Sequence, residues 1–118
     1  MALTVPDVIR AGPVEVRPGE LMATAGGQPL HLSVHEFRLL CVLAARTGRI
    51  VTREELFALV WGGALRRGDR SVDVYVRKLR VKFAAAIPDF VCIHTHVGFG
   101  YRFSPERLHP FHTPATDR

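Results

Sequence analysis

The sequence contains little cysteine, with only Cys41 and Cys92 among its 118 residues. Two cysteines are too few for a disulfide framework, so we expect reduced thiols in a cytoplasmic protein. No apolar run approaches the roughly 18–20 residues that a membrane span requires. The start of the chain also lacks a basic segment followed by an apolar one, so no signal peptide is predicted. These absences favour a single globular domain without membrane association.

Motifs typical of enzymes are also missing. The sequence contains no G-x-S-x-G, no P-loop, no H-E-x-x-H and no paired carboxylates in a plausible cleft. The G-x-G in residues 98–100 lies in a predicted hairpin, and no helix follows it to cradle a dinucleotide phosphate. We therefore predict that the chain is not an enzyme and needs no cofactor.

Acidic residues are scarce in one segment. The whole chain has 16 Lys and Arg against 11 Asp and Glu, a net charge of +5. Between residues 66 and 82 only Asp69 and Asp73 oppose seven basic side chains, which are Arg66, Arg67, Arg70, Arg77, Lys78, Arg80 and Lys82. A cationic patch on an otherwise near-neutral domain indicates a polyanionic partner. The alternative is a solvated helix face that is charged for solubility.

Residues 8–32 contain short apolar pieces separated by Gly and Pro turns, which predicts a small antiparallel sheet of three or four strands. Two helices should follow. Ser33 and Glu36 form a capping box before an amphipathic helix over 34–46. Thr52 and Glu55 form a second box, and the apolar face behind it comprises Leu56, Leu59 and Val60. Trp61, at the end of this helix, either packs in the core or faces a partner.

The segment "DRSVDVYVRKLRVKF" alternates like a strand at its start, but it belongs to a stretch without Gly or Pro that is too long for a typical strand. At helical spacing its apolar side chains form a narrow stripe, which comprises Val72, Val76, Leu79 and Phe83. The opposite face carries Val74 and Val81 among cations. Exposed valines beside cations favour a partner that presents both phosphates and apolar groups. A DNA major groove is such a partner, because thymine methyls lie there.

The segment "FVCIHTHVGFGYRF" predicts two strands, about 90–95 and 100–103, joined by a turn at Gly98 and Gly100. A hairpin after a basic helix is the wing arrangement. We expect an extension at 1–7, a domain at 8–104 and a flexible tail at 105–118. Cys92, His94 and His96 would share one face of a regular strand, so a metal-responsive regulator is an alternative, with a fourth ligand from His109 or His112.

Three stretches together resemble the effector domain of the OmpR/PhoB-type response regulators, a winged helix-turn-helix. They are "LSVHEFRLLCVLAARTGRIVTREELFALVWG", "DRSVDVYVRKLRVKF" and "IHTHVGFGYRF". The resemblance covers about residues 8–104. It implies an α+β fold in which a small N-terminal antiparallel sheet precedes three helices and a C-terminal β-hairpin wing. It also implies sequence-specific binding of double-stranded DNA by a transcriptional regulator.

The resemblance further implies the contact residues. A recognition helix over about 70–85 would enter the major groove, and the family's usual DNA-facing positions on it are Arg70, Ser71, Val74, Tyr75, Arg77, Lys78 and Arg80. Arg80 lies toward the side of the helix and is expected at a phosphate. Thr95 and Tyr101 match wing positions, over about 94–101, that touch the DNA backbone. Trp61 matches a position that can reach a phosphate.

The family's wing commonly carries two arginines at positions that His94 and Val97 occupy here. His96 or Arg102 are candidates to replace the lost contact. The loop 62–68 corresponds to a segment that the family often presents to RNA polymerase. The resemblance implies a tandem, head-to-tail pair of protomers on DNA and a receiver or other regulatory domain outside this chain. A winged helix used only as a protein-interaction module is a further alternative.

Overall fold

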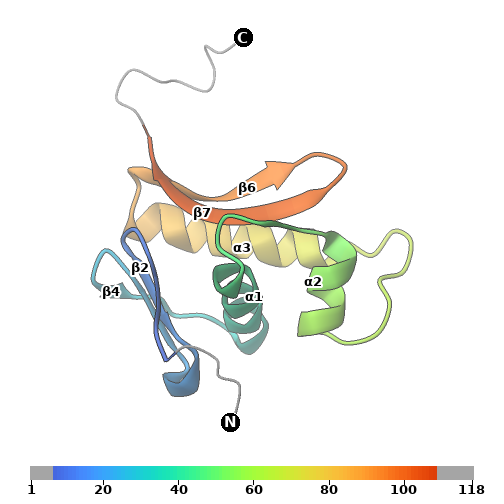
Figure 1. Ribbon diagram of the computed structural model, residues 1–118, viewed down its shortest axis with the longest axis horizontal. Helices are drawn as coiled ribbons and strands as arrows, with labels where there is room; N and C mark the ends of the chain where they lie inside the picture. Colours follow the sequence, from blue (N-terminus) through green and yellow to red (C-terminus); the bar gives the residue numbers. More distant parts are fainter. Residues whose placement is uncertain (1–6, 109–118) are drawn as a thin grey trace.

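The computed structural model describes residues 7–108, and Figure 1 shows the arrangement of its elements. A four-stranded sheet precedes three helices, and a second sheet of three strands closes the domain. The chain order is β1 (Ile9–Ala11), β2 (Val14–Arg17), a 3-10 turn (Pro18–Glu20), β3 (Met22–Ala25), β4 (Gln28–Pro29), α1 (Val34–Ala45), β5 (Ile50–Val51), α2 (Arg53–Val60), α3 (Ser71–Ala86), β6 (Phe90–His96) and β7 (Gly100–Arg107). The predicted α+β winged helix-turn-helix fold is confirmed.

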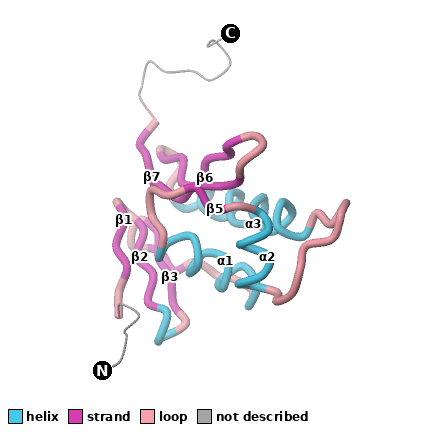
Figure 2. The backbone as a smooth tube through the Cα atoms, turned by 45° about the vertical axis from the view of Figure 1, so that its right-hand side comes forward, coloured by secondary structure: helices cyan, strands magenta, loops and turns pink. Residues whose placement is uncertain are grey.

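The N-terminal sheet has four antiparallel strands in the order of the chain, as the turn spacing predicted. Side chains along β2 and β3 point alternately to the inner and the outer face of the sheet. Val14 and Val16 on β2, with Ala23 and Ala25 on β3, are buried against the helices. This sheet lies at the opposite end of the molecule from the loop between α2 and α3 (Figure 2).

The two predicted capping boxes differ in the structure. At α1 the box is complete: Glu36 N donates to Ser33 Oγ at 3.2 Å, and Ser33 N donates to Glu36 Oε1 at 2.9 Å. At α2 the Thr52 hydroxyl accepts from Glu55 N at 3.0 Å, but the Glu55 carboxylate lies 3.9 Å from Arg46 instead. The short helix α2 buries Leu56 and Val60, whereas Leu59, predicted on the same face, is exposed.

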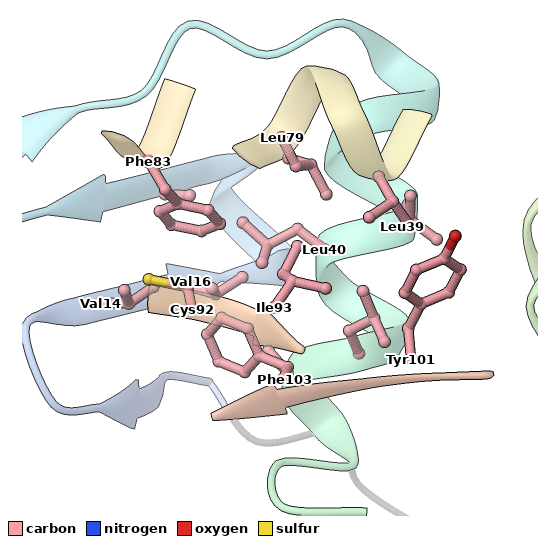
Figure 3. Packing of buried hydrophobic residues seen from close by; sticks show 14 of the residues in the cluster. Val14, Val16, Leu39, Leu40, Leu79, Phe83, Cys92, Ile93, Tyr101 and Phe103 are labelled. Atoms are coloured by element: carbon pink, nitrogen blue, oxygen red, sulfur yellow. The ribbon is translucent and has the colours of Figure 1, made fainter. Parts of the chain in front are cut away.

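The segment whose first residues alternate like a strand forms the helix α3. Its predicted stripe of Val72, Val76, Leu79 and Phe83 is buried. Figure 3 shows Leu79 and Phe83 above Ile93 and Phe103, which come from the two wing strands. The core thus lies between α3, α1 and the wing sheet, and it fixes the orientation of the helix relative to the hairpin.

The wing sheet contains one strand more than predicted. The order is β5-β7-β6, and β5 pairs its two residues, Ile50 and Val51, with Arg102 and Tyr101. Two residues are too few to show a periodic pattern, which explains why the sequence did not reveal β5. Gly100 stands against this strand with φ +149°, and a Cβ there would lie 2.1 Å from Val51 O. Only glycine therefore fits at this end of the turn.

The last strand is longer than predicted. β7 continues past the expected end at 103, because Glu106 and Arg107 still pair with Val91 and Phe90. Pro105 lies opposite the register shift between Val91 and Ile93, where the regular pairing of the two strands is interrupted and a residue without an N–H is tolerated. The expected tail over 105–118 thus begins with strand residues, and its remainder from 109 lies outside the described residues, as do residues 1–6.

Candidate nucleic-acid interface

The outer face of α3 is exposed and mixes charge with apolar surface. Val74 is 45% and Val81 62% exposed. Arg77 and Lys78 lie between them in sequence and are exposed as well. These four residues, with Glu36 and Lys82, line a shallow depression of about 410 Å³. The predicted partition of the helix into a buried stripe and an outer basic face is confirmed.

The start of α3 extends this cationic surface. Arg70 is exposed, and so are Arg66 and Arg67 in the preceding loop. Asp69 Oδ1 accepts hydrogen bonds from Ser71 Oγ at 2.6 Å and from Ser71 N at 2.8 Å. These two bonds, with a smaller contribution from Arg66, hold the pKa of Asp69 below its ordinary value. The Ser71 hydroxyl therefore uses its proton within the protein but keeps its acceptor capacity.

Asp73, on the first turn of α3, is the centre of a charged network. Arg53 Nε donates to its Oδ1 at 2.8 Å, and the Tyr101 hydroxyl donates to the same oxygen. Arg70 Nη2 lies 3.2 Å from Oδ2, although Oδ2 has no partner in hydrogen-bond geometry. Burial raises the pKa of Asp73, but the bonds from Tyr101 and Arg53 outweigh burial and hold it below its ordinary value. Sequence reasoning missed Arg53, which lies 20 residues away on α2.

Tyr101 is not where its predicted contact with the DNA backbone requires it. Its side chain is only 4% exposed, and it packs in the core with Phe103 and Ile93. Figure 3 shows Tyr101 at one side of the labelled cluster, and its hydroxyl binds Asp73. The alternation of the strand placed Tyr101 on the inner face, so its effect on any partner is indirect.

Trp61 belongs to an aromatic cluster between the helices. Its ring stacks on His35 with a centroid distance of 5.2 Å and on Phe57 at 5.5 Å. The Tyr75 ring approaches it edge-on at 5.3 Å, and Lys78 Nζ lies 4.7 Å from the Tyr75 centroid. Both Trp61 and Tyr75 are half-buried. Trp61 therefore packs against the core on one side and stays partly exposed on the other, and one edge of the cluster lies beside the basic face.

Besides Arg70, which stays exposed while it pairs with Asp73, two basic residues of the predicted patch have partners within the domain. Arg80 donates from Nε and Nη2 to Ile93 O at 3.1 and 2.9 Å, and from Nη2 to Thr95 Oγ1 at 2.7 Å. Lys82 Nζ lies 2.6 Å from the buried carboxylate of Glu36 on α1. The other five basic residues between 66 and 82 are exposed. The cationic surface is therefore smaller than the count of charges indicated.

The wing presents an apolar tip. Val97 is 88% and Phe99 70% exposed. Thr95 is exposed, whereas His96 is half-buried and its Nε2 accepts from Arg102 Nε at 3.0 Å. Arg102 also contacts Glu106 at 3.2 Å. The two candidates for the missing wing arginine thus bind each other, and the tip itself carries no cation between Val97 and Gly100.

The predicted metal alternative does not assemble. The register shift in β6 places both Cys92 and Ile93 in the core, so Cys92 does not share an open face with the histidines. Burial raises the pKa of the Cys92 thiol to about 12, and His94 Nε2 lies 2.8 Å from Ser104 O. Within residues 7–108 no three His, Cys, Asp or Glu side chains could hold a metal ion together. His109 and His112, the possible fourth ligands, lie outside the described residues.

Known proteins resemble this chain in sequence and in fold. The family model described as "Transcriptional regulatory protein, C terminal" matches residues 27–103. The chain is 38% identical over 94 residues to the transcriptional regulatory protein CreB of Escherichia coli, which covers 80% of this chain and 41% of CreB. Such relatives are more than twice as long as the part that this chain matches. No helix in residues 7–108 is long and apolar enough to cross a membrane.

Solved structures agree with the family match. The DNA-binding domain of CpxR from E. coli superposes with a TM-score of 0.76 at 31% identity, covering 85% of this chain and 97% of that one. The DNA-binding domain of RstA from Klebsiella pneumoniae, solved in complex with the RstA box, gives 0.76 and 31%, covering 86% of this chain and 100% of that one. The chain therefore belongs to the family of C-terminal domains of transcriptional regulatory proteins.

Proposed function

We propose that the chain is a sequence-specific, double-stranded DNA-binding effector domain of a response-regulator type transcriptional regulator. The observation that carries the proposal is the outer face of α3, where exposed Arg70, Arg77 and Lys78 alternate with exposed Val74 and Val81. Cations alone would serve any polyanion. Apolar groups among them suit the edges of base pairs in a major groove, where thymine presents a methyl group.

The contacts divide by position. Arg70, Ser71, Val74 and Arg77 are proposed to face base edges, since they lie along the exposed side from the start to the middle of α3. Lys78, Thr95 and the edges of Trp61, Tyr75 and His96 are proposed to lie near phosphates. Phosphate contacts fix the register of the protein on the duplex, whereas base contacts select the sequence.

Further partners are proposed from the family. RstA was solved with its DNA box, and relatives such as PhoB are named as regulators of a phosphate regulon. By analogy, this domain acts in the cytoplasm without enzymatic activity, as a tandem protomer pair on DNA. A receiver or other regulatory domain would lie outside this chain, and the loop 62–68 would face RNA polymerase.

The test is the salt dependence of duplex binding. Five exposed cations between Arg66 and Lys78 would each displace a counterion from the duplex, whether they reach a base edge or a phosphate, so the slope of log K against log salt should be about −4 to −5. Fluorescence anisotropy with a labelled duplex from a random-library selection would measure it. Arg10 is exposed on β1, whose sheet lies opposite the loop between α2 and α3 (Figure 2), so Arg10→Ala supplies the matched control and should leave binding unchanged.

A slope near zero, or no binding at low salt, would contradict the proposal. That outcome would favour the protein-interaction module, because the same fold can bind another protein without using the charges of α3.

A further inference from the structure

The contact between Arg80 and the wing joins the two parts of the proposed interface. Arg80 lies in the middle of α3, whereas Ile93 and Thr95 lie on β6, 13 and 15 residues further along the chain. The guanidinium places two nitrogens on Ile93 O and uses Nη2 for the Thr95 hydroxyl as well. Its central carbon also lies 5.6 Å from the Tyr101 ring centroid. One side chain thus bridges helix and hairpin.

The position of β6 explains why this bridge matters. In the order β5-β7-β6, the strand β6 is at the edge of the wing sheet, and α3 runs beside it (Figure 1). The guanidinium gives a carbonyl of this edge strand a charged hydrogen-bond partner from outside the sheet. A second tie, from Tyr101 on β7 to Asp73, holds the same hairpin near the first turn of α3. The two ties are about two helical turns apart along α3.

We infer that Arg80 is a positioning residue, which sets the wing against α3 and aims the Thr95 hydroxyl at a DNA phosphate. Thr95 Oγ1 accepts from Arg80, so the threonine's own O–H is free to donate. Thr95 is exposed, so its hydroxyl would donate a hydrogen bond to a phosphate oxygen. The positive charge of Arg80 beside it would strengthen this contact. The aiming of Thr95 rests on the proposed function, whereas the coupling of wing and helix belongs to the free protein.

Arginine and lysine separate this role from a simple phosphate contact. Lysine keeps the positive charge but lacks the rigid planar fork, in which Nε and Nη2 both reach Ile93 O while Nη2 also binds Thr95. If Arg80 served only as a charge near DNA, Arg80→Lys would behave much like the native protein. As a positioning residue, Arg80→Lys should resemble Arg80→Ala.

The first experiment is amide hydrogen exchange on the free protein, followed by NMR. In Arg80→Ala and Arg80→Lys the amides of β6 and β7 should exchange at least about tenfold faster, as expected for loss of hydrogen bonds to a charged group. Amides of β2 and β3 should keep their native rates. Arg77→Ala and Arg77→Lys, at an exposed arginine on the same helix, are the matched controls and should leave the wing unchanged.

Unchanged wing rates in Arg80→Lys would overturn the inference. Equal acceleration in β2 and β3 would also overturn it, since that pattern reports general destabilisation rather than a loosened wing.

The second experiment measures DNA affinity in a double-mutant cycle. Thr95→Val should weaken binding about tenfold in the native background but less than about twofold in Arg80→Lys, where the hydroxyl is no longer aimed. Thr95→Ser retains the hydroxyl and should bind nearly normally. Additive losses would overturn the aiming of Thr95. If the native protein bound no duplex, the proposed function would fail, while the exchange result would still decide the coupling of wing and helix.

Discussion

The Tyr101 hydroxyl donates a hydrogen bond to Asp73 Oδ1, so that the wing strand β7 is tied to the first turn of α3. The same carboxylate oxygen accepts from Arg53 on α2. The elements α2, α3 and β7 therefore meet at one largely buried charge. The geometry of the DNA-facing surface depends on residues that do not themselves face outward.

Asp73→Asn should destabilise the domain. The substitution removes the charge that Arg53 and Tyr101 bind, and bonds to a charged group typically contribute about 1.5–3 kcal/mol each. We expect the free energy of unfolding at pH 7, measured with urea, to fall by roughly 2–3 kcal/mol. Tyr101→Phe keeps the packed ring and removes only one of these bonds, so it should lose less, about 1.5 kcal/mol. Native stability in Asp73→Asn would mean that the network contributes nothing.

Acid should destabilise the domain through Glu36. Burial raises the pKa of this carboxyl, but the hydrogen bonds from Lys82 and from the Ser33 amide outweigh burial and hold it below its ordinary value of 4.5. Because the folded pKa is the lower one, the stabilisation is complete above the unfolded pKa. It is lost as the pH falls through the folded pKa.

Thermal unfolding from pH 7 to pH 3 checks this expectation. The native Tm should fall below about pH 5, since the unfolded carboxyl begins to bind protons there. Glu36→Gln should be less stable at pH 7 and should show a shallower decline with acid. Asp73 shifts in the same direction, so part of the decline should remain in this variant. Equal pH profiles for the two proteins would contradict the role of Glu36.

Arg77 should select DNA sequence. It is exposed at the centre of the outer face of α3, so Arg77→Ala should cost roughly 1–3 kcal/mol on the preferred duplex and relax the choice of base there. Anisotropy titrations with the preferred duplex and with single-base variants measure both effects. Arg10→Ala is the control for a general loss of charge. Equal losses on preferred and random duplexes would show that Arg77 contacts only phosphates.

The wing tip should accept a cation. Val97 is almost fully exposed beside Phe99, at a position where the family commonly carries arginine. Val97→Arg should add about one phosphate contact and steepen the slope of log K against log salt by about one unit. Val97→Gln adds length and polarity without charge, so it should leave the slope unchanged. A slope that is the same in all three proteins would place the tip away from the duplex.

Local pattern alone determined the main elements of this domain. The helical spacing of Val72, Val76, Leu79 and Phe83 assigned α3 and its buried side correctly, and Ser33 with Glu36 marked the start of α1. The glycines at 98 and 100 located the wing turn. Each of these signals depends on residues that are close together in the sequence. The geometry of such residues follows directly from their spacing.

The partners of the charged side chains were decided only by the tertiary structure. Asp73 bonds across 20 residues to Arg53, Tyr101 bonds across 28 residues to Asp73, and Lys82 reaches Glu36 across 46. A count of charges predicted seven basic groups for the patch, but packing brings Arg80 and Lys82 to acceptors within the protein and leaves five exposed. Spacing along a helix sets the direction of a side chain, whereas the groups it meets there come from whichever distant segments the core places beside it.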